Sequence, residues 1–405
     1  MAGIRNPLRD KVAIVGVGTT RYSRRNDGIT GHALAVEAAV NSIRDAGIAR
    51  EEIDGLCIAA PATRAATAQY LQEGLGIPAL RWWANLSTGS IASFSLVECI
   101  NAVFSGACTT ALMVHPSSRS GFNSQSIMQD PFRAREASQP TPKMMVPLGH
   151  PQFYTPYRNA TAGYAGFMNR YMHEYGATRE DFGRVAINMR SNALRNDHAI
   201  LQTPLAMDDY LAARYIREPM CMLDMDIPID GADALLVTTA ERARDLRKKP
   251  VYVHAATFGQ TEHPEDDQAI DLQHTGQHIV CNTLWEKSEL KREDVDLLML
   301  YDGYSVITLN WLENLGYCRP GEAGAFMASQ WDAAGNRVMI GGRVPVNPHG
   351  GSLSEGASQG AGHLREAVQQ LRGEAGARQV PGCRTALAAL GGFFFNSTAI
   401  MLRVD

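Results

Sequence analysis

Ile48-Ala-Arg-Glu-Glu-Ile-Asp-Gly-Leu56 has a counterpart near the other end of the chain, Leu290-Lys-Arg-Glu-Asp-Val-Asp-Leu-Leu298. The two segments are identical at four positions, which pair Arg50 with Arg292, Glu51 with Glu293, Asp54 with Asp296 and Leu56 with Leu298. Each segment follows a predicted helix and leads into a predicted buried strand. Because the same text recurs in the same structural context, the sequence predicts two duplicated halves.

Strands and helices alternate in both halves, which is typical of an α/β fold. The predicted strands span residues 12–18, 53–59, 110–115, 234–238, 251–258, 295–301, 384–390 and 398–404. The predicted helices span residues 32–46, 87–104, 161–175, 179–196, 241–246, 269–287 and 361–372. We assign residues 1–116 and 226–250 to the N-terminal half and residues 251–405 to the C-terminal half. Residues 117–225 form a predicted loop and helical insertion between them.

The composition is that of a folded globular protein, since 45% of the 405 residues are apolar and 20% are charged. Lys and Arg total 38 against 42 Asp and Glu, a net charge of −4, so nucleic acid is not an expected partner. Neither a membrane-spanning run nor a signal peptide is found, which predicts a cytoplasmic location. The seven cysteines form no CxxC pair, which predicts buried, reduced thiols.

Three familiar patterns are given a structural reading instead of a functional one. Gly16-Val-Gly18 follows a strand, but Arg21 stands where a dinucleotide loop needs its third glycine. His274 and His278 have no third ligand at zinc spacing. Gly356-Ala-Ser-Gln-Gly360 matches a hydrolase elbow, but a glycine-rich loop precedes it where a buried strand would be needed.

Three other segments place polar groups beside apolar ones. Trp82-Trp-Ala-Asn-Leu-Ser-Thr-Gly-Ser90 leads into an apolar helix, whose first N–H groups could stabilise an oxyanion. Leu300-Tyr-Asp-Gly-Tyr-Ser305 ends a buried strand, where open α/β sheets bind ligands. Val346-Asn-Pro-His-Gly-Gly-Ser-Leu-Ser-Glu-Gly356 combines glycines with polar side chains. The residues alone leave a simpler interpretation open for each segment. In the same order, these are a helix cap, a tyrosine at the core edge and a turn-rich linker.

In their joint order these landmarks resemble the thiolase superfamily, most of all the sterol-carrier-protein (lipid-transfer-protein) thiolases and their steroid side-chain aldolase relatives. The resemblance rests on VAIVGVGTTRYS, STGS, RYMHEYGATREDF, DGADALLVTTAERARDL, YDGYS with LENLGYC, VNPHGG and LRGEAG. It implies an α/β thiolase fold of two duplicated halves in five layers, αβαβα, with a loop and helical insertion. Members of the superfamily are usually dimers.

The chain departs from thiolases at the groups that transfer acyl chains. Leu86 stands where thiolases have the cysteine that becomes acylated, and an alkyl side chain cannot form a thioester. Ala357 and Ser358 follow Gly356, where thiolases have His-Pro. Ala389 falls where their second cysteine is found. The resemblance therefore excludes Claisen chemistry through residue 86.

The aldolase branch lacks the same groups, and the resemblance makes Tyr301 the leading proton-transfer group. Family aldolases have a further tyrosine where this chain has Ala357, so either the pair of tyrosines does not apply to this chain or His349, Glu355 or Tyr304 substitutes for the second one. A phenol is a poor base near pH 7, so His349 or Asp302 is expected to assist Tyr301. The backbone N–H groups of Ser87 and Thr88 are candidates for holding the thioester oxygen. The predicted apolar pocket is formed by Leu86, Trp82, Gly392 and the phenylalanines that begin at Phe393.

The resulting expectation is a retro-aldolase that cleaves a β-hydroxyacyl-CoA with a steroid or aromatic tail, without a covalent cysteine intermediate. No cofactor is expected, since coenzyme A enters as part of the substrate. The expected assembly is a homodimer joined by a small partner protein with an OB-fold and a zinc ribbon, two of each. Two alternatives remain open: a catalytically silent scaffold subunit, and an acyltransferase that uses another nucleophile such as Ser87 or Cys99.

Overall fold

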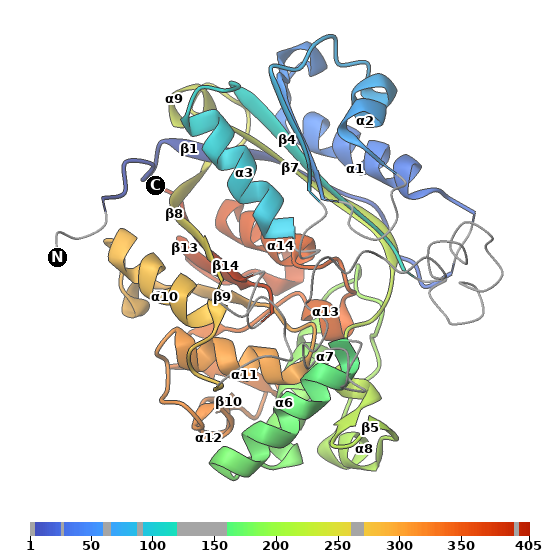
Figure 1. Ribbon diagram of the computed structural model, residues 1–405, viewed down its shortest axis with the longest axis vertical. Helices are drawn as coiled ribbons and strands as arrows, with labels where there is room; N and C mark the ends of the chain where they lie inside the picture. Colours follow the sequence, from blue (N-terminus) through green and yellow to red (C-terminus); the bar gives the residue numbers. More distant parts are fainter. Residues whose placement is uncertain are drawn as a thin grey trace, which may run out of the picture.

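The computed structural model describes residues 5–25, 28–59, 66–86, 92–119, 160–260, 271–392 and 397–405. Its centre is a nine-stranded sheet. The strands follow the spatial order β3 (Trp82–Leu86), β2 (Gly55–Ala59), β4 (Thr110–Ser118), β7 (Asp230–Thr239), β1 (Val12–Thr19), β8 (Val251–Gly259), β14 (Ser397–Arg403), β13 (Thr385–Leu390) and β9 (Leu297–Leu300). Figure 1 labels the strands from β4 to β9 of this sheet. Most of the predicted strands are thus confirmed to within a few residues.

The two halves of this sheet repeat one connectivity. Outward from the centre, β1-β7-β4-β2 in the first half corresponds to β8-β14-β13-β9 in the second. The first two strand pairs of each half are antiparallel and the third is parallel. The first strands, β1 and β8, meet antiparallel at Ala13 opposite Tyr252 and Ile14 opposite Val251. The duplication predicted from the repeated segments is confirmed.

Helices form three layers around the two half-sheets, giving the expected five. α1 (Gly31–Ala46) packs on β1, β4 and β7 of the first half, and α10 (Gly276–Lys287) packs on β8 and β14 of the second. Between them, α3 (Ala92–Phe104) and α14 (Ala361–Arg372) contact each other and strands of both halves. Figure 1 shows α3 and α14 near the centre, with α1 and α10 on opposite sides.

The glycines of Gly16-Val-Gly18 allow α1 to lie close to β1. A Cβ atom at Gly18 would be 2.1 Å from the Ala38 carbonyl oxygen, and one at Gly16 would be 2.5 Å from that of Ser42. α1 begins at Thr30, whose side chain accepts a hydrogen bond from the Ala33 N–H, and ends at Gly47 in the left-handed conformation. These glycines therefore serve packing, as expected.

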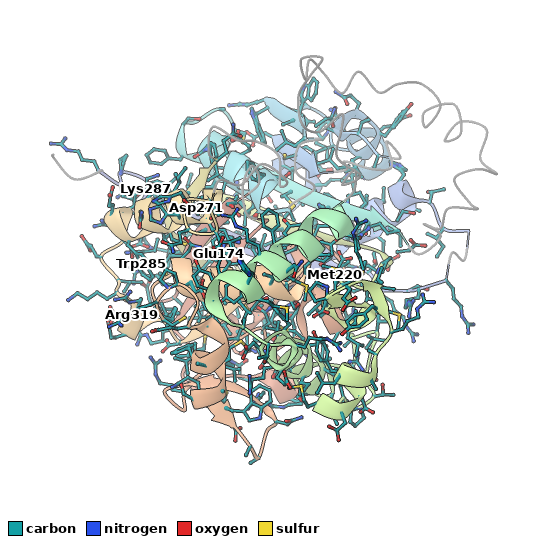
Figure 2. All side chains as sticks on the ribbon, turned by 60° about the horizontal axis from the view of Figure 1, so that its bottom comes forward. Glu174, Met220, Asp271, Trp285, Lys287 and Arg319 are labelled. Carbon is teal, nitrogen blue, oxygen red and sulfur yellow. The ribbon has the colours of Figure 1, made fainter. Side chains whose placement is uncertain are left out.

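The described part of the insertion is mostly helical. It comprises α6 (Ala160–Tyr175), α7 (Arg179–Ala193), α8 (Met207–Ala212) and the hairpin of β5 (Tyr215–Arg217) and β6 (Met220–Cys221). Figure 2 shows α6 in front of the molecule, with Glu174 near its C-terminal end. The buried helix α7 packs against α11 (Ser305–Asn314), α12 (Ala323–Ser329) and α13 (Gly351–Ser354).

Smaller elements complete the described chain, and several boundaries differ from the prediction. The smaller elements are α2 (Ala68–Leu75), α9 (Ala240–Ala243), β10 (Trp331–Asp332), β11 (Arg337–Ile340) and β12 (Val344–Pro345). Trp82–Leu86 is an edge strand, which the sequence did not reveal, and the described parts of α3 and α10 begin at Ala92 and Gly276. No helix in the described ranges has the length and apolar character needed to cross a membrane.

Candidate active site

Asn347 fixes the end of β9, where Tyr301 and Asp302 lie. Its side-chain Oδ1 accepts from the Leu300 N–H at 2.7 Å, and its Nδ2 donates to the Leu300 carbonyl at 2.6 Å. The Asn347 N–H also donates to the Leu298 carbonyl at 2.9 Å. The side chain thus imitates one more residue of a neighbouring strand, and it orients the backbone directly before Tyr301.

Tyr301 is 8% exposed and lies against Gly303. A Cβ atom at Gly303 would be 2.9 Å from the Tyr301 hydroxyl oxygen, so only glycine leaves that hydroxyl its present place. Burial raises the pKa of Tyr301 well above its usual value, and the charge of Asp226 raises it further. The phenol is therefore protonated at neutral pH, which suits a hydrogen-bond donor or an acid better than a base.

An ion pair lies beside this phenol. Arg119 donates to Asp226 with Nη1 at 2.9 Å and Nη2 at 3.4 Å, and the Asp226 N–H donates to the Gly303 carbonyl at 3.1 Å. After burial, the two groups act on the pKa of Tyr301 in opposite directions, since Asp226 raises it and Arg119 lowers it. The segment before β7 is thereby attached to the loop that carries Tyr301.

Tyr304 belongs to the same loop and contacts the insertion. Its ring stacks on that of Tyr164 from α6, with ring centroids 4.4 Å apart and an interplanar angle of 20°. Its hydroxyl lies 3.3 Å from the Thr161 Oγ1. α6 thus covers one side of the loop, and Tyr304 holds it there.

Asp302 is fully buried and its carboxylate is occupied by hydrogen bonds. It accepts from the Ser352 N–H at 2.8 Å, the Leu353 N–H at 3.1 Å and His363 Nε2 at 3.0 Å. The carboxylate therefore holds the start of α13 and the His363 ring. Its expected help to Tyr301 can act only through these partners, because the described contacts of its oxygens do not include the phenol.

His349 and Glu355 lie deeper in the core, at 0% and 1% exposure. The His349 ring packs edge-on against His363, with centroids 4.5 Å apart, and His363 lies 6.1 Å from the Tyr301 ring. Nε2 of His349 is 3.9 Å from Oε2 of Glu355. The structure thus brings Tyr301, Asp302, His349 and Glu355 into one connected cluster, with His363 at its centre.

A row of asparagines on α7 and just beyond it holds the loop that carries His349. Asn188 and Asn192 donate to the Val346 carbonyl at 3.1 and 2.9 Å, and Asn196 donates to the His349 carbonyl at 2.8 Å. Their spacing of four residues places them on one helix face. The insertion therefore positions the glycine-rich loop with amide groups, a role that an apolar-period reading of α7 does not reveal.

Glu355 also belongs to an ion-pair network that joins the two halves of the fold. Arg365 on α14 donates to Glu355 at 2.5 Å, to Asp233 on β7 at 2.6 Å and to the Tyr22 hydroxyl at 2.9 Å. The Tyr22 hydroxyl in turn donates to Asp233. One oxygen of Glu355 is thereby committed to Arg365, while the other faces His349.

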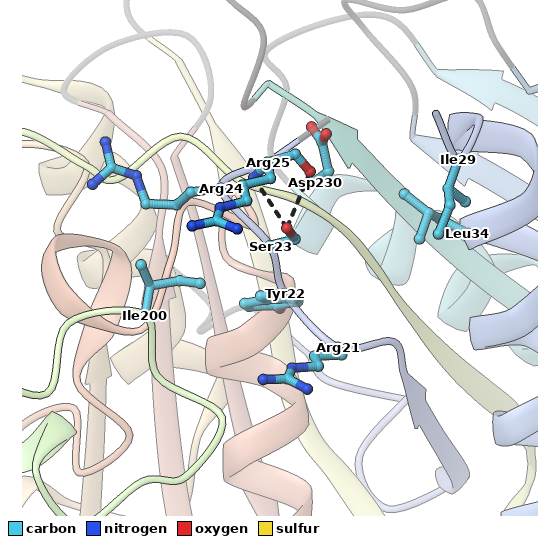
Figure 3. A pocket seen from close by; sticks show the side chains of 9 residues that line it. All are labelled: Arg21, Tyr22, Ser23, Arg24, Arg25, Ile29, Leu34, Ile200 and Asp230. Atoms are coloured by element: carbon cyan, nitrogen blue, oxygen red, sulfur yellow. Dashed lines mark hydrogen bonds between the residues drawn. The ribbon is translucent and has the colours of Figure 1, made fainter. Parts of the chain in front are cut away.

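Tyr22 is also the floor of a surface pocket with a volume of about 490 Å³. The pocket is lined by Arg21, Tyr22, Ser23, Arg24, Arg25, Ile29, Leu34, Ile200 and Asp230. Figure 3 shows Ile29 and Leu34 on one side of it and Ile200 on the other. The pocket lies at the outer end of the ion-pair network, so the network connects a basic surface to the buried cluster.

The remaining predicted pocket residues come from both halves of the fold. Leu86 is the last residue of β3 and is partly buried against the main core, as is Trp82. Gly392 is buried, and its carbonyl accepts from Ser397 Oγ at 2.7 Å. Ser87, Thr88 and Phe393 lie outside the described residues. The first described residue of α3, Ala92, donates its N–H to the Gln359 carbonyl at 3.0 Å, which places the start of this helix beside the loop before α14.

The cysteines offer no activated thiol. Six of the seven are buried, and Cys318 is partly buried, as expected for structural thiols. Burial raises the pKa of Cys99 well above its usual value and raises the pKa of Cys108, Cys318 and Cys383 to about 12. Since the thiolate is the nucleophile, Cys99 does not suit acyl transfer. Ser358 is 3% exposed and accepts from the Gly362 N–H at 2.8 Å, which fits a turn.

Metal ligation finds no support in the described ranges, where no group of three or more His, Cys, Asp or Glu side chains has suitable geometry. His274 is exposed and pairs with Asp271 at 2.7 Å. The nitrogen of His278 lies 2.9 Å from Asn282 Nδ2. Neither histidine has the ligand set of a zinc site in the described ranges, but only His278 lies on α10, because His274 precedes the first residue of that helix.

Sequence reasoning missed several members of the cluster. His363 was assigned only to a helix, and nothing in the local sequence distinguishes it from a surface histidine. Arg119 and Asp226 are 107 residues apart in the chain; Arg119 directly follows β4, whereas Asp226 lies in the segment before β7. Asn347 was quoted within its loop, but its left-handed backbone, with φ of 51°, and its strand-like bonds were not foreseen.

Comparisons with known proteins agree with this geometry. Residues 259–403 match the family described as Thiolase C-terminal domain-like. The chain is 33% identical to the 17-hydroxy-3-oxo-4-pregnene-20-carboxyl-CoA lyase of Mycobacterium tuberculosis over 90% of this chain and 92% of that protein. It is 32% identical to a steroid side-chain-cleaving aldolase of Thermomonospora curvata over 98% of this chain and 99% of that protein.

Solved structures give the same picture. A structure described as the Ltp2-ChsH2(DUF35) aldolase superimposes with a TM-score of 0.83 at 30% identity, covering 98% of this chain and 99% of that chain. The acetyl-CoA acetyltransferase of Syntrophomonas wolfei superimposes with a TM-score of 0.69 at 15% identity, covering 98% and 100%, which shows the shared fold.

The duplicated five-layered sheet and these matches define a thiolase-fold protein. Within that fold, the chain belongs to the family of the steroid side-chain-cleaving aldolases, which are carbon–carbon lyases related to thiolases. The resemblance noted from the sequence is confirmed, and so is the expectation of an enzyme of the lyase class.

Proposed function

We propose that this chain cleaves the Cα–Cβ bond of a β-hydroxyacyl-CoA by a retro-aldol reaction, releasing a ketone or aldehyde and a shorter acyl-CoA. The named lyase and aldolase relatives support a steroid tail on the acyl group. Coenzyme A enters as part of the substrate, with no separate cofactor. One observation carries the proposal: the buried, protonated phenol of Tyr301 lies directly after β9, beside the Arg119–Asp226 ion pair. The side chain at position 86, a leucine, cannot be acylated.

The reaction needs a base for the β-hydroxyl proton and an acid for the enolate. As the O–H proton leaves, the Cα–Cβ electron pair moves to the thioester enolate, and a proton then returns to Cα. Tyr301 is suited to the second step, because a protonated phenol can donate to the enolate in a low-dielectric site. No proton is consumed overall, so the base and the acid must exchange one between turnovers.

Incubation with a 17-hydroxysteroid 20-carboxyl-CoA is expected to yield the free ketone and a short acyl-CoA, with no acyl group left on the protein. The reason is that Leu86 replaces the acylated cysteine and the cysteines described above are buried thiols. Chromatography measures the products, and intact-protein mass spectrometry measures any adduct. A stable acyl adduct at any cysteine or serine would favour an acyltransferase, whereas no turnover with or without partners would favour a silent scaffold.

A small partner protein is proposed to complete the enzyme, most simply as two copies of each chain. The support is the structural neighbour described as an aldolase complex with a DUF35 component. Co-expression with a DUF35-type protein is expected to give a complex of twice the heterodimer mass by light scattering. If the chain alone is dimeric and its turnover does not change when the partner is added, the partner proposal is wrong.

A further inference from the structure

Buried polar atoms without hydrogen bonds gather around His349. Among the described residues, both nitrogens of His349, Nδ1 of His363 and Oε2 of Glu355 are buried and have no hydrogen-bond partner. The two rings are 4.5 Å apart, and the 3.9 Å between His349 Nε2 and Glu355 Oε2 is too long for a direct hydrogen bond. Leaving such atoms dry costs free energy, so this gap calls for a polar occupant that can both donate and accept.

Asp302 determines which nitrogen of His363 can act. The carboxylate accepts from Nε2 at 3.0 Å, while two backbone N–H groups fix the carboxylate itself. Nε2 therefore carries the hydrogen, and the lone pair of the neutral ring is on the unpaired Nδ1. A carboxylate on one nitrogen and a free lone pair on the other is the arrangement of a proton-accepting histidine.

We propose that a buried water bridges His363 and His349, and that His363, oriented by Asp302, receives the substrate's β-hydroxyl proton through this water. The inference rests on the proposed function and supplies the base that Tyr301 cannot be. In the forward step the proton passes to the water and a proton of the water passes to His363 Nδ1. Tyr301 then protonates Cα and becomes a phenolate. The His363 imidazolium gives its proton back to the water, and a proton of the water passes to the Tyr301 oxygen, so no proton is gained or lost over the cycle.

The surrounding charges favour His363 over His349 as the seat of this proton. Asp302 and Tyr301 face the pair from the end of β9, Glu355 from the end of α13, and Arg365 from α14, with Arg378 and His198 farther out. Burial lowers the pKa of His349 well below its usual value, and the nearby His363 and Arg365 lower it further. Only His363 has a carboxylate in direct contact to stabilise its charged form.

His363→Gln is expected to lower kcat about 100-fold with little change in KM. A glutamine amide can still donate to Asp302, so the contact between α14 and Asp302 is kept while the proton acceptor is removed. Wild-type kcat should fall at low pH, because a protonated base cannot accept the substrate's proton, and this acid limb should be absent from the variant. The matched control is His254→Gln, since His254 is also buried and lies 3.4 Å from Asp10, but is outside the cluster. Wild-type kcat or an unchanged acid limb in His363→Gln would overturn the proposal.

Folding must be followed at each pH, because buried neutral histidines also affect stability. Burial lowers the pKa of His115 and His198 to about 4, and that of His349 as well. As the pH falls, these histidines bind protons in the unfolded chain before they do so in the folded protein. Their contribution to the free energy of unfolding is therefore complete above about pH 6.5 and declines as the pH falls toward 4. A loss of folding would lower the activity of His363→Gln at low pH as well, whereas the acid limb should be present in wild type and in the His254→Gln control and absent from His363→Gln.

Two measurements on the wild-type protein keep the proposal testable if the variant does not fold. A proton inventory in mixed light and heavy water should be curved, because more than one proton moves, and a linear inventory would contradict the relay. A high-resolution crystal structure should show an ordered water within about 3.2 Å of His363 Nδ1 and of His349. If the crystal structure shows no water between His363 and His349, the inference is refuted, whether or not the protein has aldolase activity. Failure of the proposed function is a different result, since it appears as a lack of substrate turnover.

Discussion

Tyr301→Phe is expected to lower kcat at least about 100-fold, while KM and the free energy of unfolding change little. The ring volume and its contact with Gly303 are kept, and only the proton donor is lost. The hydroxyl makes no hydrogen bond to another described residue, so its removal should cost no more than about 1 kcal/mol of stability. Steady-state turnover of a confirmed substrate and urea unfolding measure the two effects separately.

Tyr317→Phe is the matched control for this variant. Among the described residues, the buried Tyr317 hydroxyl has no hydrogen-bond partner, and the ring packs beside Phe326, away from the candidate site. This control should retain wild-type kcat. If Tyr301→Phe also turns over substrate at the wild-type rate, Tyr301 is a tyrosine at the core edge and the proposed mechanism is wrong.

Local patterns predicted the fold well where a segment's own residues decide its structure. The apolar period of residues 32–46 ended at Gly47, which indeed has the left-handed conformation of a helix cap. The helix predicted at 361–372 is α14 without change. The repeated Arg-Glu text before two buried strands revealed the duplication, because the two halves use the same short 3-10 turns at Arg50–Glu52 and Arg292–Asp294.

Tertiary context decided what the sequence could not show. Trp82–Leu86 was assigned to the approach to a helix, but its alternating burial is that of an edge strand pairing with β2. The resemblance named Tyr301, Asp302, His349 and Glu355 as catalytic candidates, and in the structure they lie in one cluster; their catalytic roles stay predictions. It could not assign what each side chain contacts, because Asp302, His363 and Arg119 meet partners that are 50 to 107 residues away in the chain.

The same limit applies to the network that connects the two halves of the fold, where one arginine serves two carboxylates. Arg365 is 4% exposed, Asp233 is fully buried and Glu355 is 1% exposed. Asp233 belongs to the first half, whereas Arg365 and Glu355 belong to the second. The guanidinium also donates to Tyr22 and Thr19, so the whole network depends on its positive charge. Its removal would leave two buried carboxylates without their cation.

Arg365→Met is therefore expected to lower the free energy of unfolding by about 3–5 kcal/mol, because an uncompensated buried charge costs far more than a lost surface contact. Methionine keeps most of the side-chain volume, so the loss reflects charge more than packing. Urea unfolding followed by fluorescence measures the effect. The matched control is Arg170→Met, which breaks an ion pair to Glu174 whose side chains are each 33% exposed, and it should cost less than about 1 kcal/mol. Equal losses in the two variants would show that the buried network contributes no more to stability than a surface ion pair.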